Sequence, residues 1–303
     1  MIKPQVSVII PCYNSAKFVD KTLQAVFNST FSDFEVIVVD DGSNDDTKKI
    51  LMEKGWFDKI QYVYQANKGI AGARNVGIKM AQGKYISLLD VDDQPLPDKL
   101  EKIVSYLDSY PEFKMAYSPC IMERIDKRRE RYVQNLYSSH TPYWLQKKYE
   151  GDIFLNLFFM DIFLSSALID KKAILSIGLF DECFKVCEDL ELRLRFGAQY
   201  KIGFIKTPHT IHVMHHANAS KKMAELFPHY LMLVYNRYYQ PLKKRSSRGE
   251  KIYRECMASA SWGLAKALLQ KGDRKGAKKK AVDAIRMNPY RSKYYLNIYK
   301  FWL

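Results

Sequence analysis

The stretch Glu35–Ser43, which reads EVIVVDDGS, is a run of β-branched residues that ends in two aspartates, a glycine and a serine. The run predicts a buried β-strand, and the polar cluster predicts a turn at the carboxyl end of that strand. Similar apolar runs occur at Val6–Pro11, Ile60–Tyr64 and Tyr85–Leu89, and segments with helical periodicity separate them. Near-continuous apolar strands that alternate with short helices predict an α/β fold, with a mostly parallel sheet and helices on both of its faces.

Sheets of this kind bind ligands at the carboxyl ends of their strands, and polar residues gather at those ends here. Cys12–Asn14 follow the first strand, Asp40–Ser43 the second, and Asp90–Asp93 the fourth. The segment Asp90–Asp93, which we call the acidic loop, holds three carboxylates that repel one another. A hard cation such as Mg²⁺ or Mn²⁺, bridging to phosphate oxygens, would compensate this repulsion. The alternative is a solvated acidic turn before Pro95.

Two other segments carry residues that could take part in ligand binding or catalysis. Asn67–Gly77 places small residues around Arg74 at a predicted helix start, and both a helix N-terminus and an arginine favour phosphate; a flexible loop before a closely packed helix explains the same pattern. Glu188 and Asp189 precede another helix, where one could act as a general base and the other could hold a hydroxyl or cap the helix. The four histidines between His209 and His216 lack the Cys or His partners of a zinc site.

Composition narrows the class of protein. A length of 303 residues suggests about two domains. Five cysteines without a CxxC pair indicate a reducing cytosol and argue against disulfides or a zinc site. No apolar run is long enough to span a membrane, and the chain starts directly with a strand rather than a signal peptide. We therefore expect a cytoplasmic protein.

The positive charge is concentrated near the C-terminus. The chain carries a formal net charge of +15, and residues 242–303 hold 17 Lys and Arg against 4 Asp and Glu, a net of +13. Such a segment favours a polyanion: nucleic acid, an anionic lipid surface or an anionic polymer. The aromatic end, Tyr294–Leu303, suggests an interfacial helix on an anionic membrane. In the alternative, Tyr295, Ile298, Phe301 and Trp302 pack on the preceding helical hairpin.

Taken in order, five motifs resemble glycosyltransferase family 2, whose members are inverting enzymes that use nucleotide-sugar donors. The motifs are Val6–Asn14, Val39–Ser43, Asn67–Gly77, Asp90–Asp93 and Glu188–Asp189. The resemblance extends from about Val6 to Ser220. It implies a GT-A type domain over residues 1–220, followed by a basic helical region over residues 221–303.

The resemblance also implies roles for individual residues. Asp189 matches the general base, with Glu188 beside it as the second catalytic acid. The metal, Mn²⁺ or Mg²⁺, would be held by Asp92, Asp93 and His215. The residues expected to bind the nucleotide sugar are Pro11, Tyr13, Asn14, Asp40, Asp41, Asn67, Arg74, Asp90 and Asp92.

The expected function is inverting transfer of a sugar, by default from a UDP-sugar, to a hydroxyl of a glycan or lipid-linked acceptor. This reaction belongs to the assembly of surface polysaccharides or glycoconjugates, and the basic helices would place the enzyme on the cytoplasmic face of the membrane. A nucleotidyltransferase of related fold is a rival hypothesis, but it would need a glycine-rich triphosphate loop where Pro11–Asn14 stands. A non-catalytic carbohydrate-binding protein is a second rival, and a nucleic-acid-binding tail is a third. We expect no nucleic-acid partner.

Overall fold

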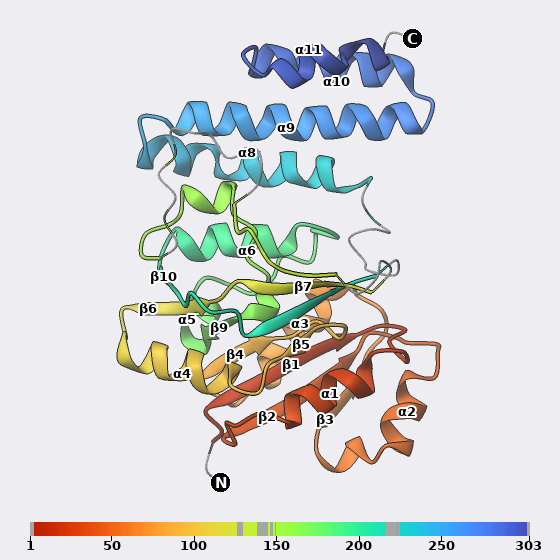
Figure 1. Ribbon diagram of the computed structural model, residues 1–303, viewed down its shortest axis with the longest axis vertical. Coiled ribbons are helices and arrows are strands. Elements are labelled where there is room, and N and C mark those ends of the chain that lie inside the picture. Colours follow the sequence, from red (N-terminus) through yellow and green to blue (C-terminus); the bar gives the residue numbers. More distant parts are fainter. Residues whose placement is uncertain are drawn as a thin grey trace. The chain divides into compact units, whose positions relative to one another are not determined.

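The computed structural model of the chain describes residues 3–125, 130–137, 145, 148, 150–215, 223 and 225–301. The chain forms two compact units, Met1–His216 and Ala217–Leu303 (Figure 1). The domain boundary predicted between residues 220 and 221 lies outside the described residues.

A seven-stranded sheet is the centre of the first unit, as far as its described residues go. Its strands, in order, are β10 (Lys201–Phe204), β6 (Phe113–Tyr117), β9 (Ala167–Asp170), β4 (Tyr85–Leu88), β1 (Val6–Cys12), β2 (Phe34–Asp40) and β3 (Gln61–Tyr64). Only β9 runs antiparallel to its neighbours, β4 and β6, whereas the other pairs are parallel. The predicted mostly parallel α/β sheet is therefore confirmed.

A smaller sheet lies beside the seven-stranded one. Among the described residues it contains β5 (Gln94–Pro95), β11 (Thr210–Met214), β7 (Cys120–Arg124) and β8 (Glu130–Val133), in that order. Its β11 pairs antiparallel with β5, which directly follows the acidic loop. This pairing brings the segment before His215 alongside the acidic loop, although more than a hundred residues separate them in sequence.

Helices cover both faces of the large sheet (Figure 1). Their bounds are α1 (Val19–Phe27), α2 (Thr47–Glu53), α3 (Ile70–Met80), α4 (Lys99–Ser109), α5 (Lys171–Ser176) and α6 (Glu188–Gly197), with short 3-10 turns η1 (Trp56–Asp58), η2 (Asn156–Phe158) and η3 (Leu164–Ser166). Side chains alternate along β1: Val8 and Ile10 join a buried cluster with residues of α1 and α4. Ile9 faces α3, where a Cβ on Gly77 would lie 2.3 Å from Ile9 Cγ2. Glycine at position 77 therefore lets α3 approach the sheet closely.

The second unit consists of helices. They are α8 (Phe227–Arg245), α9 (Gly249–Gln270), α10 (Arg274–Met287), α11 (Ser292–Asn297) and the 3-10 turn η4 (Ile298–Phe301). A tight corner joins α9 to α10: Gly272 adopts a φ of +84°, and the Asp273 side chain accepts a hydrogen bond from Gly276 N at 2.9 Å. Gly272 allows this turn because its positive φ is strained for other residues.

Aromatic side chains pack the C-terminal helical turns against α9. The ring of Trp262 on α9 stacks on Tyr294 at 4.6 Å between centroids and meets Phe301 edge-on at 5.1 Å. Tyr294 and Phe301 are buried, whereas Tyr295 is half exposed. Phe301 therefore packs on the hairpin, as the alternative interpretation predicts, whereas Trp302 lies outside the described residues. In the described part of the chain, every helix is too short or too polar to span a membrane.

Candidate active site

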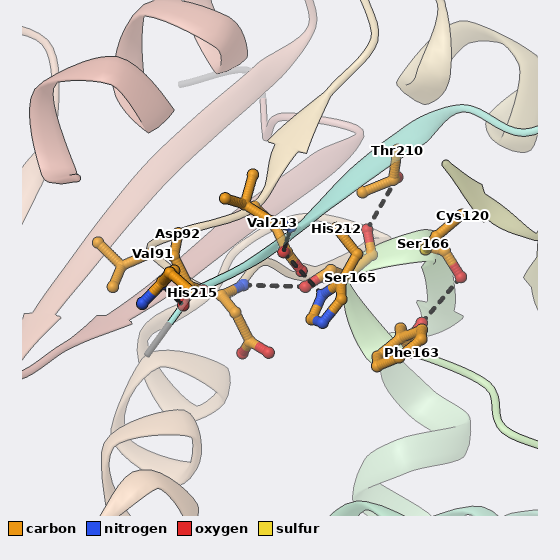
Figure 2. A network of polar contacts seen from close by, with 12 residues as sticks. Val91, Asp92, Cys120, Phe163, Ser165, Ser166, Thr210, His212, Val213 and His215 are labelled. Atoms are coloured by element: carbon orange, nitrogen blue, oxygen red, sulfur yellow. Dashed lines mark hydrogen bonds and ion pairs between the residues drawn. The ribbon is translucent and has the colours of Figure 1, made fainter. Parts of the chain in front are cut away.

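The acidic loop turns sharply after β4. Leu89 N still donates to Ile9 O of β1 at 2.9 Å, and Asp93 N then donates back to Asp90 O at 3.0 Å. The Asp90 N–H leaves the sheet and donates to Ser165 Oγ at 3.1 Å. Because the chain turns here, the three carboxylates of the loop point to different surroundings. Figure 2 shows the loop meeting β11 and the segment that holds Ser165 and Ser166.

A buried arginine connects the acidic loop to α6. Arg74 Nη2 lies 2.7 Å from Asp90 Oδ1, and Arg74 Nη1 lies 2.8 Å from Glu188 Oε1. The arginine side chain is only 4% exposed. Burial lowers the pKa of Arg74, but Asp90 and Glu188 outweigh burial, so the guanidinium pKa is above its ordinary value. The carboxylates of two distant motifs therefore share one cation.

Asp92 faces His215, the histidine that is predicted to bind the metal. Asp92 Oδ2 lies 2.9 Å from His215 Nε2, and the His215 ring stacks on Phe18 with 4.4 Å between centroids. Burial, followed by the charges of Asp93 and Asp90, raises the pKa of Asp92 to about 7. Two of the three predicted metal-binding residues are thus side by side.

Asp93, the third predicted metal ligand, points into the protein. Its side chain is completely buried, and Oδ1 accepts a hydrogen bond from Val213 N at 3.2 Å. His212 Nδ1 lies 2.9 Å from the same oxygen, whereas Asp93 Oδ2 is buried without a hydrogen-bond partner in the described part of the chain. Through these contacts Asp93 connects the acidic loop to β11 in the protein interior. The assignment of Asp93 as a metal ligand therefore stays a prediction.

Glu188 and Asp189 begin α6 and differ in their exposure. The Glu188 side chain is 10% exposed and bound to Arg74, whereas that of Asp189 is 37% exposed and lies 3.2 Å from Arg193 Nη2. Burial raises the pKa of Glu188 to about 7; Arg74 lowers it and Asp189 raises it. Cys187, which precedes them, has a φ of +64°, a left-handed conformation that is uncommon for a residue with a side chain.

Asp40 and Asp41, expected at the nucleobase, are bound by the protein itself. Asp40 Oδ1 accepts from Ser43 N at 2.8 Å, and Oδ2 accepts from the Tyr62 hydroxyl at 2.7 Å. Asp41 accepts from the Gln65 side chain and from the backbone N–H groups of Lys68 and Gly69, at 2.6 to 2.8 Å. Both carboxylates therefore fix the loops around the predicted nucleotide site.

The remaining predicted nucleotide-binding residues lie at the ends of β1 and β3. Pro11 is buried within β1, whereas Tyr13 is 51% exposed and Asn14 is exposed with a φ of +49°. The Asn14 side chain accepts from Asn44 N at 2.9 Å, and Asn67 is exposed beyond β3. The structure thus leaves Tyr13, Asn14 and Asn67 accessible to a ligand.

Sequence reasoning missed a support beneath the acidic loop. Besides accepting from Asp90 N, Ser165 uses its carbonyl to accept from Lys99 Nζ at 2.7 Å and from Thr210 Oγ1 at 3.2 Å. Lys99 is buried, which lowers its pKa to about 8. Ser165 joins α4, β11 and the loop at one point, part of which is visible in Figure 2. No motif marks it, because it is a serine within a largely apolar stretch.

Comparison with known proteins matches the chain to one enzyme family and to relatives that bear its name. The model of the family described as "Glycosyl transferase family 2" matches residues 7–177. The uncharacterized glycosyltransferase RP339 of Rickettsia prowazekii is 33% identical over 224 residues, which cover 72% of this chain and 65% of that protein. The chain thus spans slightly less than two thirds of this relative.

Solved structures share the fold at low identity. S. aureus TarS (residues 1–349) in complex with UDP superposes with a TM-score of 0.65 at 18% identity, covering 96% of this chain and 82% of that one. The same TarS fragment is also known with UDP-GlcNAc. The mannosyltransferase PcManGT from Pyrobaculum calidifontis, in complex with GDP-Man and Mn²⁺, gives a TM-score of 0.57 at 16% identity over 99% of this chain and 86% of that one. These likenesses confirm the predicted GT-A fold.

Proposed function

Because the chain belongs to glycosyl transferase family 2, we propose that it transfers a sugar from a nucleotide diphosphate sugar to an acceptor hydroxyl. The donor we propose is a UDP-sugar, and the acceptor group is a hydroxyl of a glycan or of a lipid-linked acceptor. The reaction would invert the anomeric carbon, as in the assembly of surface polysaccharides or glycoconjugates. UDP and UDP-GlcNAc are bound by TarS, whose fold this chain shares.

The contact of Arg74 with both Asp90 and Glu188 carries this proposal. Inverting transfer needs a base beside the acceptor and positive charge beside the departing diphosphate, held at a fixed separation. Arg74 joins the acidic loop, where a diphosphate would lie, to the start of α6, where a base would lie. A solvated acidic turn would not need a buried cation between two motifs more than ninety residues apart.

Asp189 is the base that we propose. It must reach an acceptor that enters from solvent, and its side chain is 37% exposed, against 10% for Glu188. Arg193, itself buried, holds the Asp189 carboxylate from the side. The carboxylate would take the proton of the acceptor hydroxyl as the oxygen attacks the anomeric carbon. Glu188, which already contacts Arg74, would set the orientation of the helix start.

Asp92 and His215 are the residues that would hold a divalent cation. Among the described residues, no three His, Cys, Asp or Glu side chains are grouped as a metal site. A cation would therefore take Asp92 and His215 from the protein and further oxygens from the donor diphosphate, a coordination that Mg²⁺ and Mn²⁺ accept. The raised pKa of Asp92 fits this assignment, because burial and neighbouring carboxylates disfavour its ionisation where a cation would favour it. The bound cation would stabilise the charge on the departing diphosphate.

We further propose that the helical unit rests on an anionic membrane surface. On α10, Ala277, Ala281 and Ala284 form the buried face, while Lys275 and Lys279 are exposed on the opposite side of the helix. Together with the net charge of +13 over residues 242–303, this arrangement favours electrostatic docking, with each basic residue contributing about 1 kcal/mol at most. The buried Tyr294 and Phe301 have no part in this contact.

Nucleotide binding tests the proposed function first. The purified chain is heated with UDP, GDP, ADP, CDP and TDP, each with Mn²⁺ and with a chelator, and the melting temperature is recorded. We expect UDP with Mn²⁺ to raise the melting temperature most. If none of the nucleotides shifts it under either condition, the proposed donor class is wrong.

A further inference from the structure

Asn75 lies next to Arg74 on α3, and it is only 4% exposed. Its amide forms a closed pair of hydrogen bonds with one residue: Nδ2 donates to Phe180 O at 3.0 Å, and Phe180 N donates to Oδ1 at 2.9 Å. Nδ2 also donates to Glu182 Oε1 at 2.9 Å. These bonds fix the orientation of the amide, because a flipped side chain would place its oxygen against Phe180 O and its nitrogen against Phe180 N.

The segment that Asn75 holds leads directly to the proposed base. Phe180 and Glu182 precede Glu188 and Asp189 by only a few residues. Besides its backbone hydrogen bonds with Asn75, Phe180 packs its ring against Arg74, with 5.3 Å between Arg74 Cζ and the ring centroid. Consecutive residues of α3 thus bind the backbone before α6, the start of α6 and the acidic loop.

We propose that Asn75 is a positioning residue for sugar transfer: it sets the place of Asp189 relative to the acidic loop through its hydrogen bonds to Phe180 and Glu182. The inference rests on the proposed function. Cys187, directly before α6, has a φ of +64°, a strained conformation that leaves the backbone little freedom to adjust. A shift of the backbone at Phe180 should therefore also move the start of α6. A displacement of about 1 Å at the reacting groups costs roughly a hundredfold in rate.

The test variant is Asn75→Asp. The new carboxylate keeps the size of the amide and still accepts from Phe180 N. Its second oxygen replaces the amide nitrogen, so it cannot donate to Phe180 O or to Glu182 and repels both. Glu182→Gln in the same chain restores a donor opposite position 75 and is the rescue. Ser7→Ala is the matched control: Ser7 is buried and accepts from Gly83 N at 2.8 Å, at the opposite end of β1 from the site.

Turnover is measured as UDP released from a UDP-sugar, and UDP affinity and melting temperature are measured on the same samples. We expect Asn75→Asp to lower kcat about tenfold to a hundredfold, with UDP affinity within threefold of wild type and partial recovery of kcat in the double variant. Ser7→Ala should lose melting temperature but keep kcat. If Asn75→Asp does not fold, Glu182→Ala should show a smaller loss of kcat in the same direction.

An unchanged kcat in folded Asn75→Asp, or a loss of kcat that the double variant does not recover, would overturn the positioning role. Hydrogen exchange of the peptide Phe180–Leu192 separates this result from failure of the proposed function, because it does not depend on turnover. Faster exchange in Asn75→Asp, but not in Ser7→Ala, supports the connection even if the wild-type chain releases no UDP. Unchanged exchange overturns it.

Discussion

Replacing Arg74 by methionine should destabilise the first unit in a pH-dependent way. The arginine is 4% exposed and pairs with Glu188, 10% exposed, and with Asp90, 33% exposed. Removing one partner of a buried ion pair costs about 3–5 kcal/mol when the other charge stays buried and ionised. Asp90 is sufficiently exposed to be solvated, so Glu188 decides the cost.

Glu188 can avoid the unpaired charge by taking up a proton. Its pKa is raised to about 7 even with Arg74 present, and Arg74 lowers it, so Arg74→Met raises it further. A carboxyl group whose folded pKa is above its unfolded value contributes stability that is fully present below the unfolded pKa and is lost as pH rises through the folded pKa. In the variant this loss continues to higher pH. We therefore expect a loss of about 1–3 kcal/mol at pH 5.5, from lost hydrogen bonds, and of about 3–5 kcal/mol at pH 8.5.

Urea denaturation at both pH values, followed by circular dichroism, measures the two losses. Lys84→Met is the control: Lys84 and Asp108 form a pair that is 55% and 38% exposed, and its removal should cost at most about 1 kcal/mol. A loss for Arg74→Met that is the same at both pH values would refute the reasoning about Glu188. A loss below that of Lys84→Met would refute the structural importance of the bridge.

Three further predictions concern function. Asp189→Asn should abolish transfer but leave UDP affinity within a few-fold of wild type, because the amide keeps the shape and removes the basicity; retained turnover would exclude Asp189 as the base. Asp92→Ala should weaken UDP binding by calorimetry more in Mn²⁺ than in chelator, and equal losses in both would count against a cation at Asp92. Lys275→Glu/Lys279→Glu should reduce sedimentation with anionic vesicles at low salt, whereas Ser7→Ala should not. If wild type does not sediment with these vesicles, the membrane proposal fails.

The sequence predicted the sheet and the edge at which the acidic loop lies. Both follow from local pattern: the apolar runs at Val6–Pro11 and Glu35–Asp40 are continuous enough to indicate buried parallel strands, and β-strands occur there. The pattern also predicts a helix directly after Glu188 and Asp189, and α6 begins at Glu188 itself. Periodicity and polar clusters are sufficient for such features because they depend on near neighbours in sequence.

The contacts between distant motifs could not be predicted in this way. That Arg74 contacts Glu188, and that Ser165 holds the acidic loop, depends on how residues 114 and 75 positions apart in sequence meet in space. Asp93 illustrates the same limit: nothing in the sequence pattern distinguishes it from Asp90 and Asp92, but the turn after Leu89 leaves Asp93 completely buried. Tertiary packing, not local pattern, determines these orientations.

The anomeric configuration of the released sugar shows whether the chain inverts the anomeric carbon of its donor. The purified chain is incubated with Mn²⁺ and a panel of UDP-sugars that includes UDP-α-GlcNAc, and proton NMR follows the anomeric signals from the first minutes, before the free sugar equilibrates. A base that activates the attacking oxygen, without a covalent intermediate, delivers that oxygen from the face opposite the diphosphate. In this assay water takes the place of the acceptor hydroxyl, and we expect the first-formed free sugar to be the β anomer where the donor is α-linked. Formation of the α anomer first would contradict inverting transfer.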